Sequence, residues 1–422
     1  MKIGFLIIGS EILDGKITDL NTKILSEYLR SHHEEIHESM VVRDTKSDIE
    51  HGLRELFHTH DVVITSGGLG PTKDDITKET IASFFGKKII FHPDALKTSE
   101  DNYKRFHRTF PGKDHTYSYL PEDFSPLSNT MGFAPGFYTK HQNKFLFSAP
   151  GVPREFKRMI EDHLFSVISE KLEKKTFLKH VIIRTKYIPE EKIFQEVDTL
   201  LWDKLSHYGE VSSLPNLMGV DIGVKVRASS EEELEKKVLE LHSIFEKSPL
   251  HKNIWGQGRE TLEEKIIKLC NLRNIKFGFA ESASGGLCSH RITGVPGSSQ
   301  SFMGSVVCYD EKIKENILGV KKETLLNHSA VSSETATEMA MGLLEKFHLD
   351  IALSITGYAG PGGGTSENPV GTVFIGKAKR GKPVEVQKLN LFGDREILKQ
   401  RFSQVALFTL LEEAEKFTSS LS

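Results

Sequence analysis

The chain has little of what would mark a secreted, membrane-bound or disulfide-rich protein. It holds only three cysteines among 422 residues, Cys270, Cys288 and Cys308. Their odd number and wide spacing exclude CxxC chemistry and do not suit a disulfide framework. No apolar run approaches the length of a membrane span. We therefore expect a reduced, cytoplasmic protein.

An excess of charge of one sign is also missing. The formal net charge is −3, and the acidic and basic residues are interspersed. The chain therefore lacks the basic face of a nucleic-acid-binding protein and the polybasic segment of a membrane anchor. The first ten residues form a short apolar run that opens into a glycine turn, which predicts a first strand rather than a signal peptide. We expect neither a nucleic-acid nor a membrane partner.

Apolar runs alternate with amphipathic segments along most of the chain, which predicts an α/β fold. We expect three domains: a layered α/β domain over residues 1–172, a small α/β domain over 173–252 and a second layered α/β domain over 253–422. The lysine-rich connector Lys171 to Lys179 marks the first boundary. In the middle domain we predict a helix from Pro189 to Leu205. That domain lacks a GxxG loop between helices, so its expected role is structural.

The stretch Ala280 to Gly286, Ala-Glu-Ser-Ala-Ser-Gly-Gly, lies between a predicted strand and a predicted helix. A hydroxyl at such a turn is exposed, and glycines leave the backbone N–H groups of the helix start open to a substrate. Ser282 is therefore a candidate nucleophile. The alternative is that Ser282 or Ser284 only caps the helix.

A serine nucleophile needs a base, and no histidine lies at a comparable turn of this domain. Tyr309 ends a predicted strand, and Lys314 follows it on the next helix. A lysine can serve as the base if burial lowers its pKa. The loop Gly360 to Gly364 could supply N–H donors to an oxyanion or a phosphate. Spacing alone also allows Lys314 to be a solvated helix residue.

The N-terminal domain has a second glycine-rich turn. The strand Val62 to Ile64 runs into Ser-Gly-Gly-Leu-Gly-Pro-Thr-Lys-Asp-Asp, and a helix is predicted from Ile76 to Phe85. Thr72 and Asp75 have the spacing of a capping box, which predicts that Thr72 starts this helix. Several N–H groups can converge on one anion at such a junction, so it suits a phosphate or a carboxylate.

Several motifs of the third domain, in order and spacing, resemble the C-terminal domain of the CinA family, known as a nicotinamide mononucleotide (NMN) deamidase. They include Ala280-Glu281-Ser282-x-Ser284-Gly285-Gly286, Val306-Val307-x-Tyr309 and Thr356-Gly357-x-Ala359-Gly360-Pro361-Gly362-Gly363-Gly364. The resemblance implies that Ser282, Tyr309 and Lys314 are catalytic and that deamidation needs no cofactor. Ala283 and Ser284 depart from the usual Cys-Thr. The expected NMN contacts are Glu281, Ser284, Gly285, Gly286, Thr356, Gly362, Gly363 and Gly364.

The first domain resembles the N-terminal domain of the same family, which is related to the molybdopterin-binding MoaB and MogA proteins. Gly67-Gly68-Leu69-Gly70-Pro71-Thr72-x-Asp74-Asp75 carries most of this resemblance. Some members cleave ADP-ribose to AMP and ribose 5-phosphate, with a divalent metal ion (Mg, Mn or Co) and K⁺. The implied metal ligands are Asp44 and Asp75, although Asp74 and Asp75 could simply favour a helix N-terminus. The expected ADP-ribose contacts are Ser10, Glu11, Asn21, Gly67, Gly68, Gly70, Thr72, Asp74, Pro150 and Gly151.

Three functions are compatible with these patterns. The first is a bifunctional hydrolase of NMN and ADP-ribose, which the resemblance implies is a homodimer. The second is an NMN deamidase whose first domain only binds nucleotides. The third is a competence or DNA-damage accessory protein that acts through interactions, and the weak net charge counts against direct nucleic-acid binding in that role.

Overall fold

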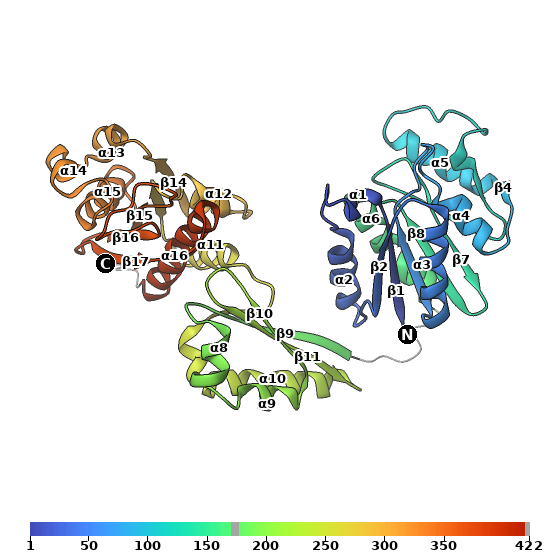
Figure 1. Cartoon of the computed structure of the whole chain (residues 1–422), viewed down its shortest axis with the longest axis horizontal. Coiled ribbons are helices and arrows are strands. Elements are labelled where there is room, and N and C mark those ends of the chain that lie inside the picture. Colours follow the sequence, from blue (N-terminus) through green and yellow to red (C-terminus); the bar gives the residue numbers. More distant parts are fainter. Residues whose placement is uncertain (170–176, 418–422) are drawn as a thin grey trace. The chain divides into compact units, whose positions relative to one another are not determined.

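The computed structural model describes residues 1–169 and 177–417, and they form an α/β protein, as the sequence predicted (Figure 1). Contacts divide the chain into two compact units, Met1–Lys179 with Val226–Lys237 and His180–Lys225 with Val238–Ser422. Part of the predicted connector, residues 171–176, lies outside the described residues. The domain boundaries at 172 and 252 therefore stay predictions. Among the described helices, none is long and apolar enough to cross a membrane.

The N-terminal domain contains a six-stranded sheet in the order β2-β1-β3-β8-β7-β6. Strands β2, β1, β3 and β8 pair in parallel, whereas β7 pairs antiparallel with both β8 and β6. A small pair, β4 and β5, lies apart from this sheet. The elements are β1 (Ile3–Ile8), α1 (Ser10–Leu13), α2 (Asn21–Ser31), β2 (Glu38–Val42), α3 (Lys46–Thr59), β3 (Val62–Ser66), α4 (Thr77–Phe84), β4 (Ile89–Phe91), α5 (Pro93–Arg105), η1 (Thr116–Ser118), β5 (Tyr119–Pro121), β6 (Ser125–Leu127), β7 (Gly136–His141), β8 (Lys144–Ala149), α6 (Pro153–Met159), η2 (Ile160–Leu164) and α7 (Phe165–Ile168).

Helices cover both faces of this sheet because neighbouring residues of its strands point to opposite sides. Phe5 of β1 packs in one core with Leu25 of α2 and Phe156 of α6. Leu6, the next residue, packs in the other core with Leu53 of α3. The near-continuous apolar runs of the parallel strands follow from this burial on two sides.

One helix start in this domain differs from the prediction. Helix α4 begins at Thr77, its N-cap position is Ile76, and no side chain caps it. The backbone N–H of Thr72 donates to Asp75 Oδ2 at 3.0 Å, and the Thr72 hydroxyl donates to the same oxygen. The prediction that Thr72 starts the helix is therefore wrong. The Thr72–Asp75 pair closes a loop turn ahead of the helix instead.

The middle segment forms a four-stranded sheet in the order β10-β11-β9-β12. The predicted helix from Pro189 to Leu205 is wrong, because three short helical segments occupy its place. The second and third segments are separated at Asp198, whose backbone leaves the helical conformation at φ −145°. Its carboxylate accepts a hydrogen bond from the Ser248 hydroxyl at 2.7 Å. The elements are β9 (Phe177–Thr185), α8 (Glu190–Lys192), η4 (Ile193–Val197), α9 (Leu201–Ser206), β10 (Gly209–Pro215), β11 (Val220–Ala228), α10 (Glu231–Lys247), η5 (Pro249–Asn253) and β12 (Ile254–Gln257).

The C-terminal domain has a five-stranded sheet in the order β14-β13-β15-β16-β17. Strands β14, β13 and β15 pair in parallel, whereas β16 pairs antiparallel with both β15 and β17. The elements are α11 (Leu262–Leu272), β13 (Phe277–Glu281), α12 (Leu287–Thr293), η6 (Ser298–Gln300), β14 (Phe302–Val307), α13 (Glu311–Leu318), α14 (Lys322–His328), α15 (Ser333–Lys346), β15 (Ile351–Gly357), β16 (Thr372–Lys379), β17 (Glu385–Asn390) and α16 (Arg395–Lys416).

This sheet is also covered on both faces. Phe279 of β13 packs with Phe402 of α16, together with residues of α11 and α12. Ala280, the next residue of β13, packs with Met339 of α15 and Leu318 of α13. Helix α16 closes the described chain, and the Ser332 hydroxyl caps α15 by accepting the backbone N–H of Thr335.

The two large sheets share one topological feature that positions the sites. In each, the first strand lies between its next two parallel partners, so β1 is flanked by β2 and β3, and β13 by β14 and β15. The connections leave these central strands in opposite directions, which opens a crevice at the carboxyl ends of the strands. Both glycine-rich turns of the sequence analysis lie at such an edge.

Candidate functional site

The predicted nucleophile follows directly after β13. Ser282 is the first residue beyond the strand, and its backbone N–H donates to the carbonyl oxygen of Ile355 on β15 at 2.9 Å. The N–H of Ala283 donates to the same oxygen at 3.3 Å. Gly285 and Gly286 have φ of +63° and +94°, which only glycine adopts readily. The turn is thus fixed to the neighbouring strand and needs its two glycines.

Lys314 contacts the nucleophile directly. Its Nζ donates to Ser282 Oγ at 3.1 Å, and also to the carbonyl oxygens of Cys308 at 2.7 Å and Tyr309 at 3.2 Å. Lys314 is 1% exposed, and it forms no ion pair with a carboxylate of the described residues. The alternative of a solvated helix residue is wrong, because the first turn of α13 directs this side chain inward.

Burial has a chemical consequence for Lys314. It lowers the pKa of the ammonium below the usual lysine value, against the opposing effect of Cys308 and of the nearby carboxylates of Glu311 and Asp310. A lysine with a lowered pKa holds more of its neutral form, which can accept a proton. The pair of Ser282 and Lys314 therefore has the geometry and the electrostatics of a nucleophile and its base.

Tyr309 lies at the edge of this pair. Its side chain is 66% exposed, and its hydroxyl accepts a hydrogen bond from Arg395 at 3.1 Å. Arg395 also donates to the carbonyl oxygen of Gly360, at the start of the glycine loop. The group of Tyr309 that touches Lys314 is its backbone carbonyl rather than its hydroxyl.

Glu281 and Ser284 lie behind the turn, and both are 0% exposed. The Glu281 carboxylate accepts the backbone N–H groups of Cys288 at 3.1 Å and Ser289 at 2.9 Å. It also accepts the hydroxyls of Ser284 and Ser289. Neither Ser282 nor Ser284 caps α12, because its N-cap position is Gly286. The first-turn N–H groups of Cys288 and Ser289 donate to the Glu281 carboxylate instead. Their burial favours a positioning role over the expected contact with NMN.

The remaining predicted contacts of this site divide into two groups. Thr356 is buried, and its hydroxyl donates to the carbonyl oxygen of Ala330 at 2.6 Å. Gly362, Gly363 and Gly364 form an exposed loop beyond β15. The backbone N–H groups of Ser284 and Gly286 make no hydrogen bond with the described residues. Ser284 is buried, so the N–H group of Gly286, which is half-buried, is the one that can reach an anion.

Two basic residues of this site were missed in the sequence analysis. Arg395 contacts Tyr309, and the Nζ of Lys399 would lie 3.6 Å from a Cβ added to Gly285. They stand four residues apart at the start of α16, so they share one face of the helix. Arg395 gave a signal, because it is the first residue of α16 and cations are unfavourable in the first turn of a helix unless an anion is near.

The N-terminal domain holds a cavity of about 560 Å³ at the carboxyl ends of its parallel strands. Ten of the twelve residues predicted for this site line it. The other two, Ser10 and Thr72, hold the aspartates in place: the N–H of Ser10 donates to Asp44 Oδ2 at 2.7 Å, and Thr72 donates to Asp75. The lining residues are Glu11, Asn21, Asp44, Gly67, Gly68, Gly70, Asp74, Asp75, Pro150 and Gly151.

Asn21 joins the loops around this cavity. Its Nδ2 donates to Ser66 Oγ at 2.7 Å and to the carbonyl oxygen of Gly151 at 2.8 Å. Its Oδ1 is buried without a partner among the described residues. Gly67 approaches Ile8 so closely that a Cβ would collide with its carbonyl oxygen. The glycine loop is therefore packed tightly, and the Asn21 amide ties two neighbouring loops together beside it.

The aspartates of this cavity fit a cation that arrives with a phosphate. In the described residues, no three His, Cys, Asp or Glu side chains form a ready-made metal cluster. Mg²⁺ is usually held by one or two carboxylates, several waters and the phosphate oxygens of a substrate. Asp44 and Asp75 supply that number of carboxylates at the cavity wall.

The sequence analysis also missed part of the cavity wall. Asp19, Tyr117, Phe133 and Glu155 line it. Burial raises the pKa of Glu155, against a hydrogen bond that its carboxylate accepts from Asn129 at 2.7 Å. All four lie far from the glycine loop in sequence, and no local spacing links them to it.

Comparison with known proteins finds a matching family for the N-terminal and for the C-terminal domain. Residues 259–414 match the model of the CinA C-terminal domain, and residues 4–170 match that of a probable molybdopterin binding domain. A Halothermothrix orenii protein named "Putative competence-damage inducible protein" is 35% identical over 407 residues, with 96% of each chain covered. A "CinA-like protein" of Kosmotoga olearia is 34% identical over 413 residues, covering 96% of this chain and 97% of its own.

Among solved structures, a CinA superfamily protein of Klebsiella pneumoniae shares 32% identity. The match covers 37% of this chain and 97% of that protein, with a TM-score of 0.36. The two full-length relatives extend over both domains and the segment between them. The similarity therefore concerns the whole chain and not one domain alone.

Proposed function

This chain belongs to the CinA family, and from that premise we propose that its C-terminal domain hydrolyses the carboxamide of NMN to the carboxylate, releasing ammonia. The observation that carries the proposal is the hydrogen bond of 3.1 Å between Lys314 Nζ and Ser282 Oγ. A buried lysine that has no carboxylate partner among the described residues, held against a half-buried serine of the turn, suits acyl transfer. Such chemistry fits an amide substrate.

The first half of the proposed reaction forms an ester. The Ser282 oxygen bonds to the amide carbon while the neutral Lys314 amine takes the hydroxyl proton. The tetrahedral intermediate then collapses, the carbon–nitrogen bond breaks, and Lys314 returns that proton to the departing ammonia. The N–H group of Gly286, which makes no hydrogen bond within the described chain and is half-buried, is the proposed donor to the oxyanion.

The second half restores the enzyme. Water attacks the ester carbon while Lys314 accepts one of its protons, and the carbon–oxygen bond to Ser282 breaks as the proton returns to the serine. The sum is amide plus water giving acid plus ammonia. Arg395 and Lys399 lie on the open side of the turn, and we assign them to the 5′-phosphate of NMN, with the exposed glycine loop beside them.

The test is ammonia release from NMN by the purified full-length protein. Replacement of Ser282 by alanine removes the nucleophile, and we expect kcat to fall by at least about 10³-fold with the fold intact. Thr337→Ala, which removes an exposed hydroxyl of α15, is the matched control. A folded Ser282→Ala protein that keeps the wild-type rate would refute the proposal.

A second activity is favoured by the N-terminal cavity. We propose that this domain binds ADP-ribose and hydrolyses its diphosphate to AMP and ribose 5-phosphate. The glycine loop lines the cavity and supplies N–H groups for the diphosphate, while Asn21 holds the loops around it through Ser66 and Gly151. A divalent cation held by Asp44 and Asp75 would offset the negative charge of the diphosphate. AMP formation by the full-length protein, with and without added Mg²⁺, tests this activity.

The other expectations stay predictions. If neither NMN nor ADP-ribose is turned over by folded protein, an accessory role through interactions becomes the leading interpretation. A homodimer, a requirement for K⁺ and a cytoplasmic location follow only from the resemblance or the composition. Sedimentation of the purified protein would measure its oligomeric state directly.

A further inference from the structure

One part of the N-terminal cavity wall has no role in the diphosphate chemistry. It consists of two aromatic side chains, Tyr117 and Phe133. Phe133 is 37% exposed, whereas Phe137, a few residues along the chain on β7, is 1% exposed. A large apolar ring left open at the wall of a cavity lowers the free energy when a ligand covers it.

The Phe133 ring is supported from behind by other aromatic side chains. Its centroid lies 4.5 Å from that of Tyr103 and 5.1 Å from that of Phe106. Both distances are typical of favourable aromatic pairs. These contacts fix the plane of the ring while part of it still faces the cavity.

The backbone that carries Phe133 is held by two buried asparagines. Asn102 Nδ2 donates to the carbonyl oxygen of Phe133 at 3.2 Å. Asn129 Nδ2 donates to the carbonyl oxygen of Ala134 at 2.9 Å, and Asn129 Oδ1 accepts the N–H of Met131 at 3.1 Å. Both asparagines are 0% exposed. The exposed ring therefore stands on a preorganised loop, which reduces the entropy lost when a ligand binds.

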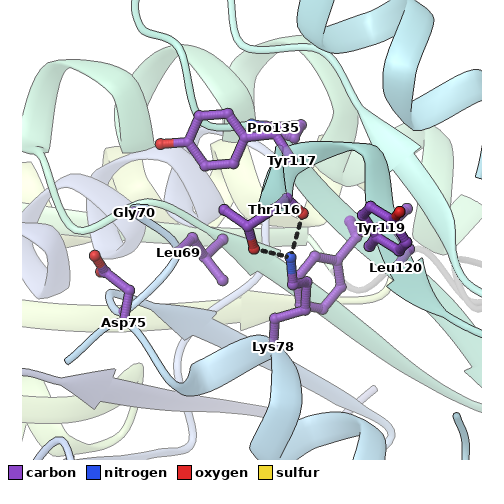
Figure 2. Close-up of a pocket in the computed structure, with 11 residues that line it drawn as sticks. Leu69, Gly70, Asp75, Lys78, Thr116, Tyr117, Tyr119, Leu120 and Pro135 are labelled. Carbon is purple, nitrogen blue, oxygen red and sulfur yellow. Dashed lines mark hydrogen bonds between the residues drawn. The ribbon is translucent and has the colours of Figure 1, made fainter. Parts of the chain in front are cut away.

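The backbone next to Tyr117 is held by hydrogen bonds from Lys78 to Thr116, shown in Figure 2. Lys78 Nζ donates to the carbonyl oxygen of Thr116 at 2.6 Å and to its hydroxyl at 2.8 Å, and the Tyr117 ring lies on the other side of Thr116. Burial raises the pKa of Tyr117 far above its usual value. Its phenol thus stays neutral and can donate a hydrogen bond to a ligand.

We propose that Phe133 and Tyr117 form the subsite for the nucleobase of the N-terminal substrate. A base would stack on Phe133 beside Tyr117, while the phosphates occupy the glycine loop and the aspartates of the same cavity. The cavity of about 560 Å³ has the size of a site for one nucleotide-like ligand. The inference deepens the ADP-ribose activity proposed above and rests on it: a base-bearing diphosphate is preferred over one without a base.

The test measures equilibrium binding to the full-length protein in Mg²⁺. The probes are α,β-methylene-ADP, which carries a base and a diphosphate that cannot be hydrolysed, and methylenediphosphonate, which has no base. Stacking of a base on an aromatic ring corresponds to about a 5- to 150-fold change in Kd. We expect Phe133→Ala to weaken the first ligand by that factor and to leave the second unchanged. Phe133→Tyr, which keeps the ring, should bind both as the wild type does.

Phe91→Ala is the matched control, because Phe91 is 41% exposed on β4 and does not line the cavity. If Phe133→Ala does not fold, Phe133→Leu keeps the apolar bulk without an aromatic face, and the same selective loss is expected. A wild-type protein that binds neither probe overturns the proposed activity together with this inference. A wild-type protein that binds both, with no change in a folded Phe133 variant, overturns the base subsite alone.

Discussion

The buried carboxylate of Glu281 allows a sharp test of how the Ser282 turn is built. In Glu281→Gln the side chain keeps its shape, and one oxygen becomes an NH₂ group. The two oxygens accept the N–H groups of Cys288 and Ser289, one each. Whichever way the amide turns, one backbone N–H meets a donor and stays unpaired, and the negative charge at the start of α12 is lost.

The size of the effect follows from these contacts. An unpaired buried polar group costs about 1–3 kcal/mol, and hydrogen bonds to a charged acceptor contribute about 1.5–3 kcal/mol. We expect the free energy of unfolding of the C-terminal domain to fall by about 3 kcal/mol, and its Tm by about 6–12 °C. A displacement of the serine by about 1 Å would lower kcat roughly 10²-fold. KM should change little, since Glu281 is 0% exposed.

The assay is NMN-dependent ammonia release by the full-length protein, with kcat and KM determined separately below the Tm of the variant. Glu413→Gln is the matched control: Glu413 is 2% exposed, but it pairs with Lys377 and Lys379 on β16 and not with the serine turn. It should lose stability and keep kcat. A raised KM with unchanged kcat in Glu281→Gln would show that Glu281 contacts the substrate. Unchanged values of both would show that the carboxylate does not position Ser282.

Two further outcomes are expected. Because burial lowers the pKa of Lys314, its neutral amine forms at lower pH than in an exposed lysine. The kcat/KM for NMN should therefore rise with pH as Lys314 loses its proton, with a midpoint below the usual lysine value, and a flat profile from about pH 6 to 10 would contradict this base. Removal of divalent metal by EDTA should abolish ADP-ribose cleavage and leave NMN deamidation unchanged, and Asp75→Asn should lower only the former, by about 10²-fold. A loss of deamidation in EDTA would contradict the assignment of the metal to the N-terminal site.

The order of strands, turns and helices could be predicted because it depends on local signals. The apolar runs ending at Ile8 and Phe279, and the glycines that follow, mark strand–turn–helix junctions without any knowledge of the fold. The places of Ser282 and of the glycine loop at the strand ends followed from that order. The predicted helix from Pro189 to Leu205 failed because Asp198 bonds to Ser248, fifty residues away in the sequence.

The chemistry of individual side chains depended on tertiary contacts. Lys314 has charged neighbours in the chain, so the local sequence does not show whether it is a buried base or a solvated residue. Only the packing of α13 against α15 and β13 buries it. The resemblance implied that Glu281 contacts NMN, but its carboxylate is buried behind the turn, because neighbouring residues at a strand end point to opposite sides. Phe133 lies in a loop and has no local signal at all, since its partners Tyr103 and Asn102 lie on helix α5, some thirty residues earlier.

The three hydrogen bonds of Lys314 have a stereochemical consequence. A protonated amine has three N–H groups, and Ser282 Oγ and the carbonyl oxygens of Cys308 and Tyr309 receive one each. When the amine loses a proton, the two carbonyls can only accept, so they retain the two remaining N–H groups. The lone pair that appears must then point at the Ser282 hydroxyl. The carbonyl oxygens of Cys308 and Tyr309 thereby orient the lone pair of the base toward the proton that it accepts, without an acidic side chain of the described residues.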